Sequence, residues 1–206
     1  MYLPFFPLKL VAFPGEELNL HIFEARYRQL ISDIESKGGS FGICTFLDQL
    51  TGFGTEMELI GVHKRYFDGR LDIRTLGKRI FKLESFENPM PGKLYAGGRV
   101  SFLSNREGVT PSLKHEYVFY LKEILYLLNY PQEISTEEVN SYSFSHKIGL
   151  SIEEELELIK LESEAERVAF LTQYFKRMIP ALKAAEEAKE KIKQNGHFKH
   201  LDPLNF

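Results

Sequence analysis

Five consecutive residues, Gly38-Gly39-Ser40-Phe41-Gly42, match the Gly-x-Ser-x-Gly pattern that presents the nucleophilic serine of many hydrolases. In those hydrolases a strand enters the turn and a helix leaves it, which exposes the serine at the edge of a sheet. Hydrophobic periodicity here predicts the opposite order, with a helix before the glycines and a strand after them. We therefore interpret Gly38 and Gly39 as a helix end followed by a turn, without a catalytic serine.

The histidine-containing motifs supply too few ligands for a metal site. His115-Glu116 begins the His-Glu-x-x-His pattern of zinc hydrolases, but Phe119 stands where the second histidine is required. His197 and His200, with Asp202 nearby, lie in a lysine-rich tail, and we interpret them as solvated side chains. These motifs therefore predict no bound metal.

A phosphate-binding loop of the Gly-x-x-x-x-Gly-Lys-Ser/Thr type does not occur in the sequence, which removes the usual cradle for ATP phosphates. The acidic runs Glu16-Glu17 and Glu153-Glu154-Glu155 stand at a predicted turn and a predicted helix start, where carboxylates complement backbone charge. We predict that the chain is not an enzyme and uses no cofactor.

Positive charge is concentrated between residues 64 and 82, where seven Lys and Arg residues accompany only two Asp residues. In Arg70–Arg74 the charges alternate with apolar residues, so they are expected on the solvent face of a strand that protects a sheet edge. The alternative is an RNA-binding surface, with Tyr66 and Phe67 as adjacent aromatic residues. Its candidate contacts are Lys64, Arg65, Arg70, Arg74, Lys78 and Arg79.

The first half of the chain has the pattern of short strands with one helix. Leu18, Leu20 and Ile22 alternate with polar residues and predict a strand, and from Phe23 the apolar period changes to that of a helix. Asp68-Gly69 predicts a hairpin turn. The expected strands after the helix are 41–47, 56–67, 70–76, 78–86 and 93–103, which together suit a barrel-like domain.

The second half of the chain has the pattern of helices. Apolar spacing predicts a helix around Tyr117–Leu128 that Asn129-Tyr130-Pro131 ends. Pro180 predicts a kink or a break in the last helix. Three further helix starts are predicted by capping boxes, Ser135 with Glu138, Ser151 with Glu154, and Ser163 with Glu166.

Composition indicates a globular protein. The chain has 206 residues, 43% of them hydrophobic, and a net charge of −3. No apolar run approaches the roughly 20 residues that cross a bilayer, and the N-terminus lacks a secretory pattern. The first of these observations means that we expect no contact with membranes. The single cysteine, Cys44, cannot form an internal disulfide, so we expect a cytoplasmic protein.

Three short blocks occur in order near the N-terminus: Leu3-Pro4-Phe5-Phe6-Pro7-Leu8, Phe13-Pro14-Gly15 and His21-Ile22-Phe23-Glu24-Ala25-Arg26-Tyr27. They resemble the opening of the Lon protease N-terminal domain, a PUA-like β-domain followed by helices. The family commonly has proline where this chain has Ala25, and the first turn of a helix tolerates either residue. Similar blocks at 60–83 and 144–167 extend the resemblance to roughly residues 3–180.

The resemblance implies an α+β fold. We expect a PUA-like, mixed or antiparallel β-barrel-like domain with one inserted helix at residues 1–110, followed by a C-terminal α-helical bundle at residues 111–206. Within the bundle, residues 181–206 are expected to form an extended helix and an irregular tail.

The resemblance also implies a function, because this region of Lon proteases engages substrates. We expect a non-catalytic polypeptide-binding module, without ATPase and protease parts, that recognises unfolded or partner polypeptide, including a protease or an adaptor. The expected route is an apolar groove or strand addition to an open sheet edge. The candidate polypeptide-binding or interdomain residues are Leu8, Leu10, Phe13, His21, Phe23, Glu24, Arg26 and Tyr27.

Overall fold

The computed structural model describes residues 1–130 and 133–196, which form two compact units. The β-unit consists of Met1–Gly108 and Asn140–Arg167, and the helical unit consists of Val109–Val139 and the chain from Val168. The predicted tail with His197, His200 and Asp202 lies outside the described residues. The predicted division into residues 1–110 and 111–206 stays a prediction.

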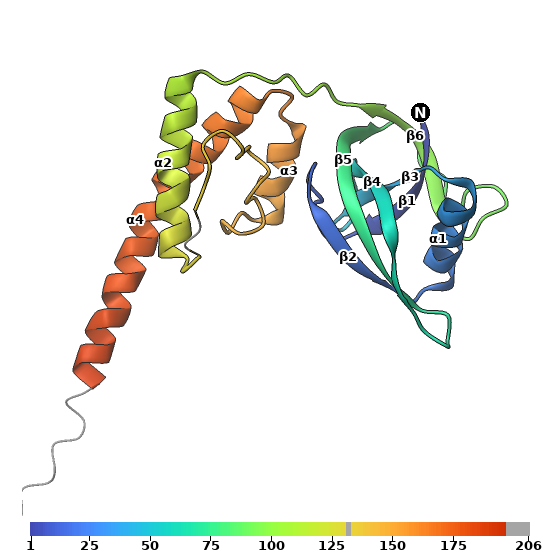
Figure 1. Ribbon diagram of the computed structural model, residues 1–206, viewed down its shortest axis with the longest axis horizontal. Coiled ribbons are helices and arrows are strands. Elements are labelled where there is room, and N and C mark those ends of the chain that lie inside the picture. Colours follow the sequence, from blue (N-terminus) through green and yellow to red (C-terminus); the bar gives the residue numbers. More distant parts are fainter. Residues whose placement is uncertain (131–132, 197–206) are drawn as a thin grey trace, which may run out of the picture. The chain divides into compact units, whose positions relative to one another are not determined.

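Six strands and four helices make up the described chain (Figure 1). The strands are β1 (Tyr2–Leu8), β2 (Glu17–Ile22), β3 (Ser40–Phe46), β4 (Leu50–Arg65), β5 (Leu71–Leu83) and β6 (Ala96–Phe102). The helices are α1 (Ala25–Lys37), α2 (Pro111–Leu127), α3 (Ile152–Lys160) and α4 (Glu164–Gly196). This composition confirms the predicted α+β class.

The six strands form one sheet in the order β2-β5-β4-β3-β1-β6, and β5 also pairs with β6. That additional pairing joins Phe81–Leu83 to Val100–Phe102, so five strands form a closed ring of pairings. β1 and β3 are parallel and the other pairs are antiparallel. The sheet is therefore mixed, as predicted, whereas the PUA-like type stays a prediction.

Within the described residues, β2 is attached to this ring through β5 alone. It pairs along Glu17–Ile22 with Leu71–Leu76, while the remainder of β5 turns toward β6. In Figure 1, β2 follows one side of β5, and the connected ends of β4 and β5 extend past the ring.

The prediction of a strand break at Gly77 is wrong, because β5 runs through this residue without interruption. The amide of Gly77 donates to the carbonyl of Glu16, and its carbonyl accepts from Gly15. A Cβ atom at position 77 would lie 2.1 Å from the carbonyl oxygen of Phe13. The glycine therefore marks a close approach between two backbone segments rather than a turn.

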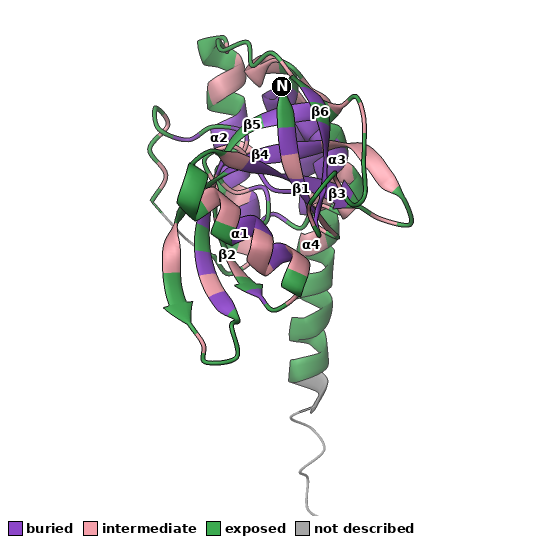
Figure 2. Cartoon of the chain, turned by 90° about the vertical axis from the view of Figure 1, so that its right-hand side faces the viewer, coloured by how far each residue is buried: buried purple, intermediate pink, exposed green. Residues whose placement is uncertain are grey.

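The core of the β-unit lies between α1 and the strands, and inside the ring (Figure 2). α1 buries Tyr27, Leu30 and Ile31, and the ring of Tyr27 stacks on Phe6 with centroids 3.8 Å apart. Phe23 was expected on the same apolar stripe, but it precedes the helix and its surface is 62% exposed. The stripe therefore begins one turn later than the sequence predicts.

Two of the three predicted capping boxes begin helices. Ser151 and Glu154 cap α3, and Ser163 and Glu166 exchange the same pair of bonds at the start of α4. The helix predicted after Ser135 is wrong, since only a turn forms there. The side chains of Asn140 and Ser143 bond to nearby amides and offer the backbone an alternative to helix.

The helical unit pairs α2 with α4 from Val168 onward. Lys176 bonds Glu116, Lys183 bonds Glu123, and the ring of Phe175 packs against Tyr117. Pro180 lies inside one continuous α4, so the predicted break does not occur.

Residues 140–167 belong to the β-unit because side chains connect them to its strands and turns. The ring of Phe13 stacks on Tyr142 at 5.6 Å. His146 bridges two carboxylates, with Nδ1 2.8 Å from Glu155 and Nε2 3.0 Å from Glu16. The bonds to Glu155 and to Glu16 raise the pKa of His146 to about 10.

Replacing His146 with glutamine is expected to lower the free energy of unfolding by about 1–2 kcal/mol near pH 6.5, since two charge-assisted bonds are lost at a partly exposed site. The raised pKa means that this stabilisation is fully present below the unfolded-state value of 6.5. It is lost as the pH rises through about 10. Urea unfolding of both proteins between pH 6.5 and 10 checks this. If the free energies of unfolding of the wild type and His146→Gln differed by the same amount across this range, the expected pH dependence would be contradicted. The control is His115→Gln, which changes an exposed histidine of a helix.

Candidate functional site

An open groove of about 720 Å³ lies on the β-unit, across three adjacent strands. It is built from β2, β4 and β5, at the side of the sheet where β2 is the outer strand. The groove residues are Glu17, Asn19, Leu20, His21, Ile60, Gly61, Val62, His63, Asp72, Ile73 and Arg74.

Irregular pairing of β4 with β5 shapes the groove. The register shifts between Leu59 and Gly61 and again between Val62 and Lys64, which are irregularities of the bulge type. Such shifts bend a strand and increase its twist, and here they fall at the groove. Ile60 is 42% exposed, and a Cβ atom at Gly61 would meet no other atom within 4 Å. The groove therefore has open space above Gly61.

Two polar residues of the groove, His21 and Asp72, are bonded to each other, and Tyr66 joins them from outside the groove lining. Nδ1 of His21 lies 2.6 Å from one oxygen of Asp72, and the hydroxyl of Tyr66 donates to the other oxygen at 2.7 Å. The bonds from His21 and then Tyr66 lower the pKa of Asp72. Both oxygens of the Asp72 carboxylate are engaged, so these bonds hold His21 and Tyr66 against one end of the groove floor strand β5.

The basic residues proposed as RNA contacts are mostly paired with carboxylates. Arg70 pairs with Asp68 in the same hairpin, at 2.7 Å. Lys64 lies over the ring of Tyr66, 4.6 Å from its centroid. The other four pair with acidic residues outside the 64–82 segment: Arg65 with Glu35, Arg74 with Glu17, Lys78 with Glu58 and Arg79 with Glu56. Four of the seven positive charges of the 64–82 segment are thus offset by carboxylates from other segments.

The predicted polypeptide-binding residues fall in different places. Phe13 and Tyr27 are buried, 1% and 4% exposed, and Leu8 and Leu10 pack against the core cluster that contains Tyr27. Only His21, which lines the groove, is at the candidate site, with its ring 6.3 Å from that of exposed Phe23.

Glu24 and Arg26 pair with each other at 2.8 Å, and neither lines the groove. The sequence interpretation missed the β4 residues Ile60, Gly61 and His63. A glycine inside a predicted strand was a usable signal, because it often marks a bulge or an open backbone approach.

Metal-binding and membrane-spanning features are not found in the part of the chain that the structure describes. In residues 1–130 and 133–196, no three His, Cys, Asp or Glu side chains gather in a way that fits a metal ion. None of the described helices is long and apolar enough to span a membrane.

The sequence matches the family described as the ATP-dependent protease La (LON) substrate-binding domain, over residues 2–195. The chain belongs to this family. The LON resemblance seen in the sequence is thereby confirmed, and it covers the sheet, the groove and the described helices.

Two solved structures share the fold of this LON domain. The crystal structure of a Lon N-terminal domain protein from Xanthomonas campestris has 25% sequence identity and a TM-score of 0.67, covering 84% of this chain and 98% of that one. The N-terminal domain of the Mycobacterium avium complex Lon protease has 14% identity and a TM-score of 0.64, covering 85% and 98%. Comparison with proteins of curated function gave no match.

Proposed function

We propose that this LON substrate-binding domain is a non-catalytic module that binds polypeptide in the groove formed by β2, β4 and β5. Family membership supports the class of ligand, because the matching family is a substrate-binding domain of a protease. The groove supports the location, because it combines open space with apolar and hydrogen-bonding side chains.

The observation that carries the proposal is that the groove combines open space with exposed apolar and polar side chains. Asp72 bonds His21 and Arg74 lies 3.9 Å from Glu17, while Ile60 is 42% exposed and Asn19 offers a side-chain amide to the same groove. A polypeptide segment presents backbone amides and apolar side chains, which such a surface suits. A polyanion would have to displace carboxylates from the basic residues, so the RNA alternative has no specific support.

The partner is proposed to be an unfolded client, an adaptor or a protease that uses this module for recognition. We also propose that the closed ring of strands is a PUA-like barrel. A reducing cytoplasm suits the one cysteine, Cys44, which is buried.

A variant that fills the groove tests the proposal. Gly61→Leu places a side chain in open space, so we expect an unchanged Tm and about tenfold weaker binding of an unfolded probe, which is about 1.4 kcal/mol. The probe is fluorescein-labelled, reduced and carboxymethylated lysozyme, titrated by fluorescence anisotropy.

The matched control is Lys82→Leu, which adds the same side chain at an exposed β5 position outside the groove. Equal binding by Gly61→Leu, Lys82→Leu and the wild type would place the polypeptide elsewhere. Absence of any binding by the wild type would refute the proposed function itself.

A further inference from the structure

β2 presents a free edge to solvent beside the groove. Among the described residues it pairs with β5 alone, whereas β1, β3, β4, β5 and β6 each have neighbours on two sides. An unpaired edge carries backbone donors and acceptors that another extended chain can satisfy.

The pairing register identifies which backbone groups face outward. The amide of Gly77 donates to the carbonyl of Glu16 and its carbonyl accepts from Gly15, so the backbone groups of Gly77 face the β2 side of β5. The register then continues without a shift from Glu17 opposite Leu76 to Ile22 opposite Leu71. Since hydrogen-bonded pairs alternate in antiparallel strands, residues 18, 20 and 22 face β5, and the amides and carbonyls of Glu17, Asn19 and His21 face away.

The free edge lacks three of the features that usually prevent strand addition, namely proline, lysine and a bulge. Residues Glu17–Ile22 contain no proline, no lysine and no register shift. Natural edge strands commonly carry such features because they block pairing with other chains. The side chains of Glu17 and His21 contact Arg74 and Asp72 of β5, so they lie over the sheet rather than across the edge.

We propose that the polypeptide bound by this domain adds to the edge of β2 as an extended strand. This inference rests on the proposed function and specifies the class of ligand: a segment with free backbone amides, recognised mainly through its main chain. Its N–H and C=O groups pair with those of Glu17, Asn19 and His21, and alternate side chains face the groove. Phe23, exposed at the end of β2, supplies an apolar contact for the same segment.

Recognition through the main chain tolerates many sequences, because every polypeptide segment except one rich in proline offers the same donors and acceptors. The groove then adds preference for the side chains that enter it. This combination suits a module whose ligands are unfolded chains rather than one fixed partner.

Two substitutions at Asn19 separate the main chain from the side chain. Asn19→Pro removes an amide that faces away from β5, so the sheet keeps its bonds, and the ring obstructs an incoming strand. We expect Asn19→Pro to bind carboxymethylated lysozyme at least about tenfold more weakly with an unchanged Tm. Asn19→Ala removes the same groove side chain but keeps the main-chain amide, so it is expected to weaken binding clearly less than Asn19→Pro. Equal losses of affinity in the two variants would overturn strand addition.

Hydrogen exchange of the wild-type protein provides a second measurement that needs no variant. Without probe, the amides of Glu17, Asn19 and His21 are expected to exchange faster than those of Leu18, Leu20 and Ile22, and saturating probe should slow the first three. Binding of the probe without this protection would overturn strand addition while leaving the proposed function intact. Protection that appears without probe and grows with protein concentration would also overturn it, because the strand would then come from a second copy. Failure of the wild type to bind any probe would remove both proposals.

Discussion

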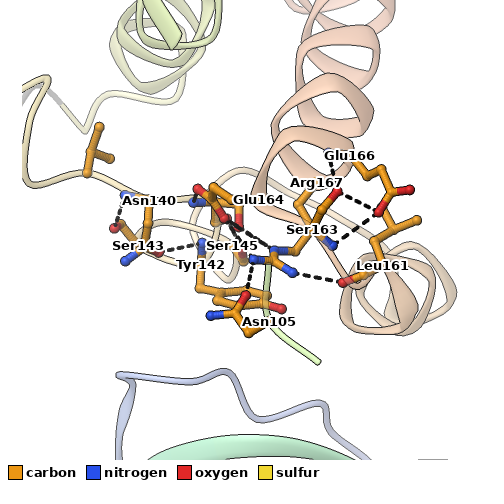
Figure 3. A network of polar contacts seen from close by, with 12 residues as sticks. Asn105, Asn140, Tyr142, Ser143, Ser145, Leu161, Ser163, Glu164, Glu166 and Arg167 are labelled. Atoms are coloured by element: carbon orange, nitrogen blue, oxygen red, sulfur yellow. Dashed lines mark hydrogen bonds and ion pairs between the residues drawn. The ribbon is translucent and has the colours of Figure 1, made fainter. Parts of the chain in front are cut away.

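Replacing Arg167 with alanine is expected to lower the free energy of unfolding by about 3–5 kcal/mol, because the change leaves a carboxylate without its partner in a largely buried network. Arg167 is 2% exposed, and its guanidinium lies 3.0 Å from Glu164, whose side chain is 14% exposed. The same group donates to the carbonyl of Leu161 and to the side chain of Asn105 (Figure 3). The side chain of Arg167 thereby connects the start of α4 to the end of α3 and to the segment after β6.

The network also organises the loop that follows residue 139. Glu164 accepts bonds from both the amide and the hydroxyl of Ser141, and the guanidinium of Arg167 lies 4.7 Å from the ring centroid of Tyr142. Lysine cannot reproduce this forked geometry, so Arg167→Lys is also expected to destabilise. A compact ammonium reaches fewer of these acceptors at once.

Urea unfolding followed by circular dichroism measures the effect of the Arg167 variants. The control is Arg106→Ala, which removes an exposed ion pair with Glu166 at 3.8 Å and is expected to cost at most about 0.5 kcal/mol. If Arg167→Ala and Arg106→Ala had similar small effects, the network would contribute no more than a surface ion pair.

Local features of the fold were predictable because their signals lie within a few residues. Asp68-Gly69 determines a hairpin turn through its own backbone preferences, and the capping boxes at Ser151 and Ser163 satisfy helix-start amides three residues away. The same motif at Ser135 failed because Asn140 and Ser143 compete for nearby backbone groups. A capping box thus predicts a helix only where the following residues do not offer such bonds.

Long-range features were not predictable from the sequence alone. The acidic partners of Arg65, Lys78 and Arg79 are Glu35, Glu58 and Glu56, which only pairing of distant segments brings near. A count of charges along residues 64–82 therefore gave a larger excess than the folded surface has.

The candidate groove was missed for a related reason. Its shape depends on the shifts of register near Gly61 and on β2 being the outer strand, and neither follows from alternating hydrophobicity. Phe13 and Tyr27 are aromatic residues that the sequence made candidates for polypeptide contact, but both are buried in the folded protein. Aromatic residues in a family motif identify the fold more reliably than they identify a ligand site.

Replacing Phe81 with alanine is expected to lower the free energy of unfolding by about 3–5 kcal/mol, because the cavity forms inside the closed ring of strands. Phe81 is fully buried and stacks on Phe5 with centroids 5.9 Å apart. Two glycines provide the room for its ring. A Cβ atom would lie 2.7 Å from the ring at Gly42 and 2.6 Å from it at Gly54.

The two glycines are expected to respond differently when the ring is removed. At Gly42 the neighbours within reach are side chains, those of Phe81 and Phe5, whereas a Cβ at Gly54 would also lie 2.3 Å from the carbonyl oxygen of Ile43. Gly42→Ala alone is expected to cost about 1–3 kcal/mol through overpacking. In the Phe81→Ala background the added methyl enters the vacated space, so its cost should disappear.

A double-mutant cycle measured by urea unfolding tests this coupling, with Gly54→Ala as the matched control. Gly54→Ala should remain destabilising in both backgrounds, because a backbone oxygen cannot move away as a ring can. Additive effects of Gly42→Ala and Phe81→Ala would show that the glycine is required for its backbone rather than for the ring. Coupling at Gly42 but not at Gly54 would establish that the ring of Phe81 is the reason why β3 requires glycine at position 42. It would also establish that contact with the backbone of β3 is the reason why β4 requires glycine at position 54.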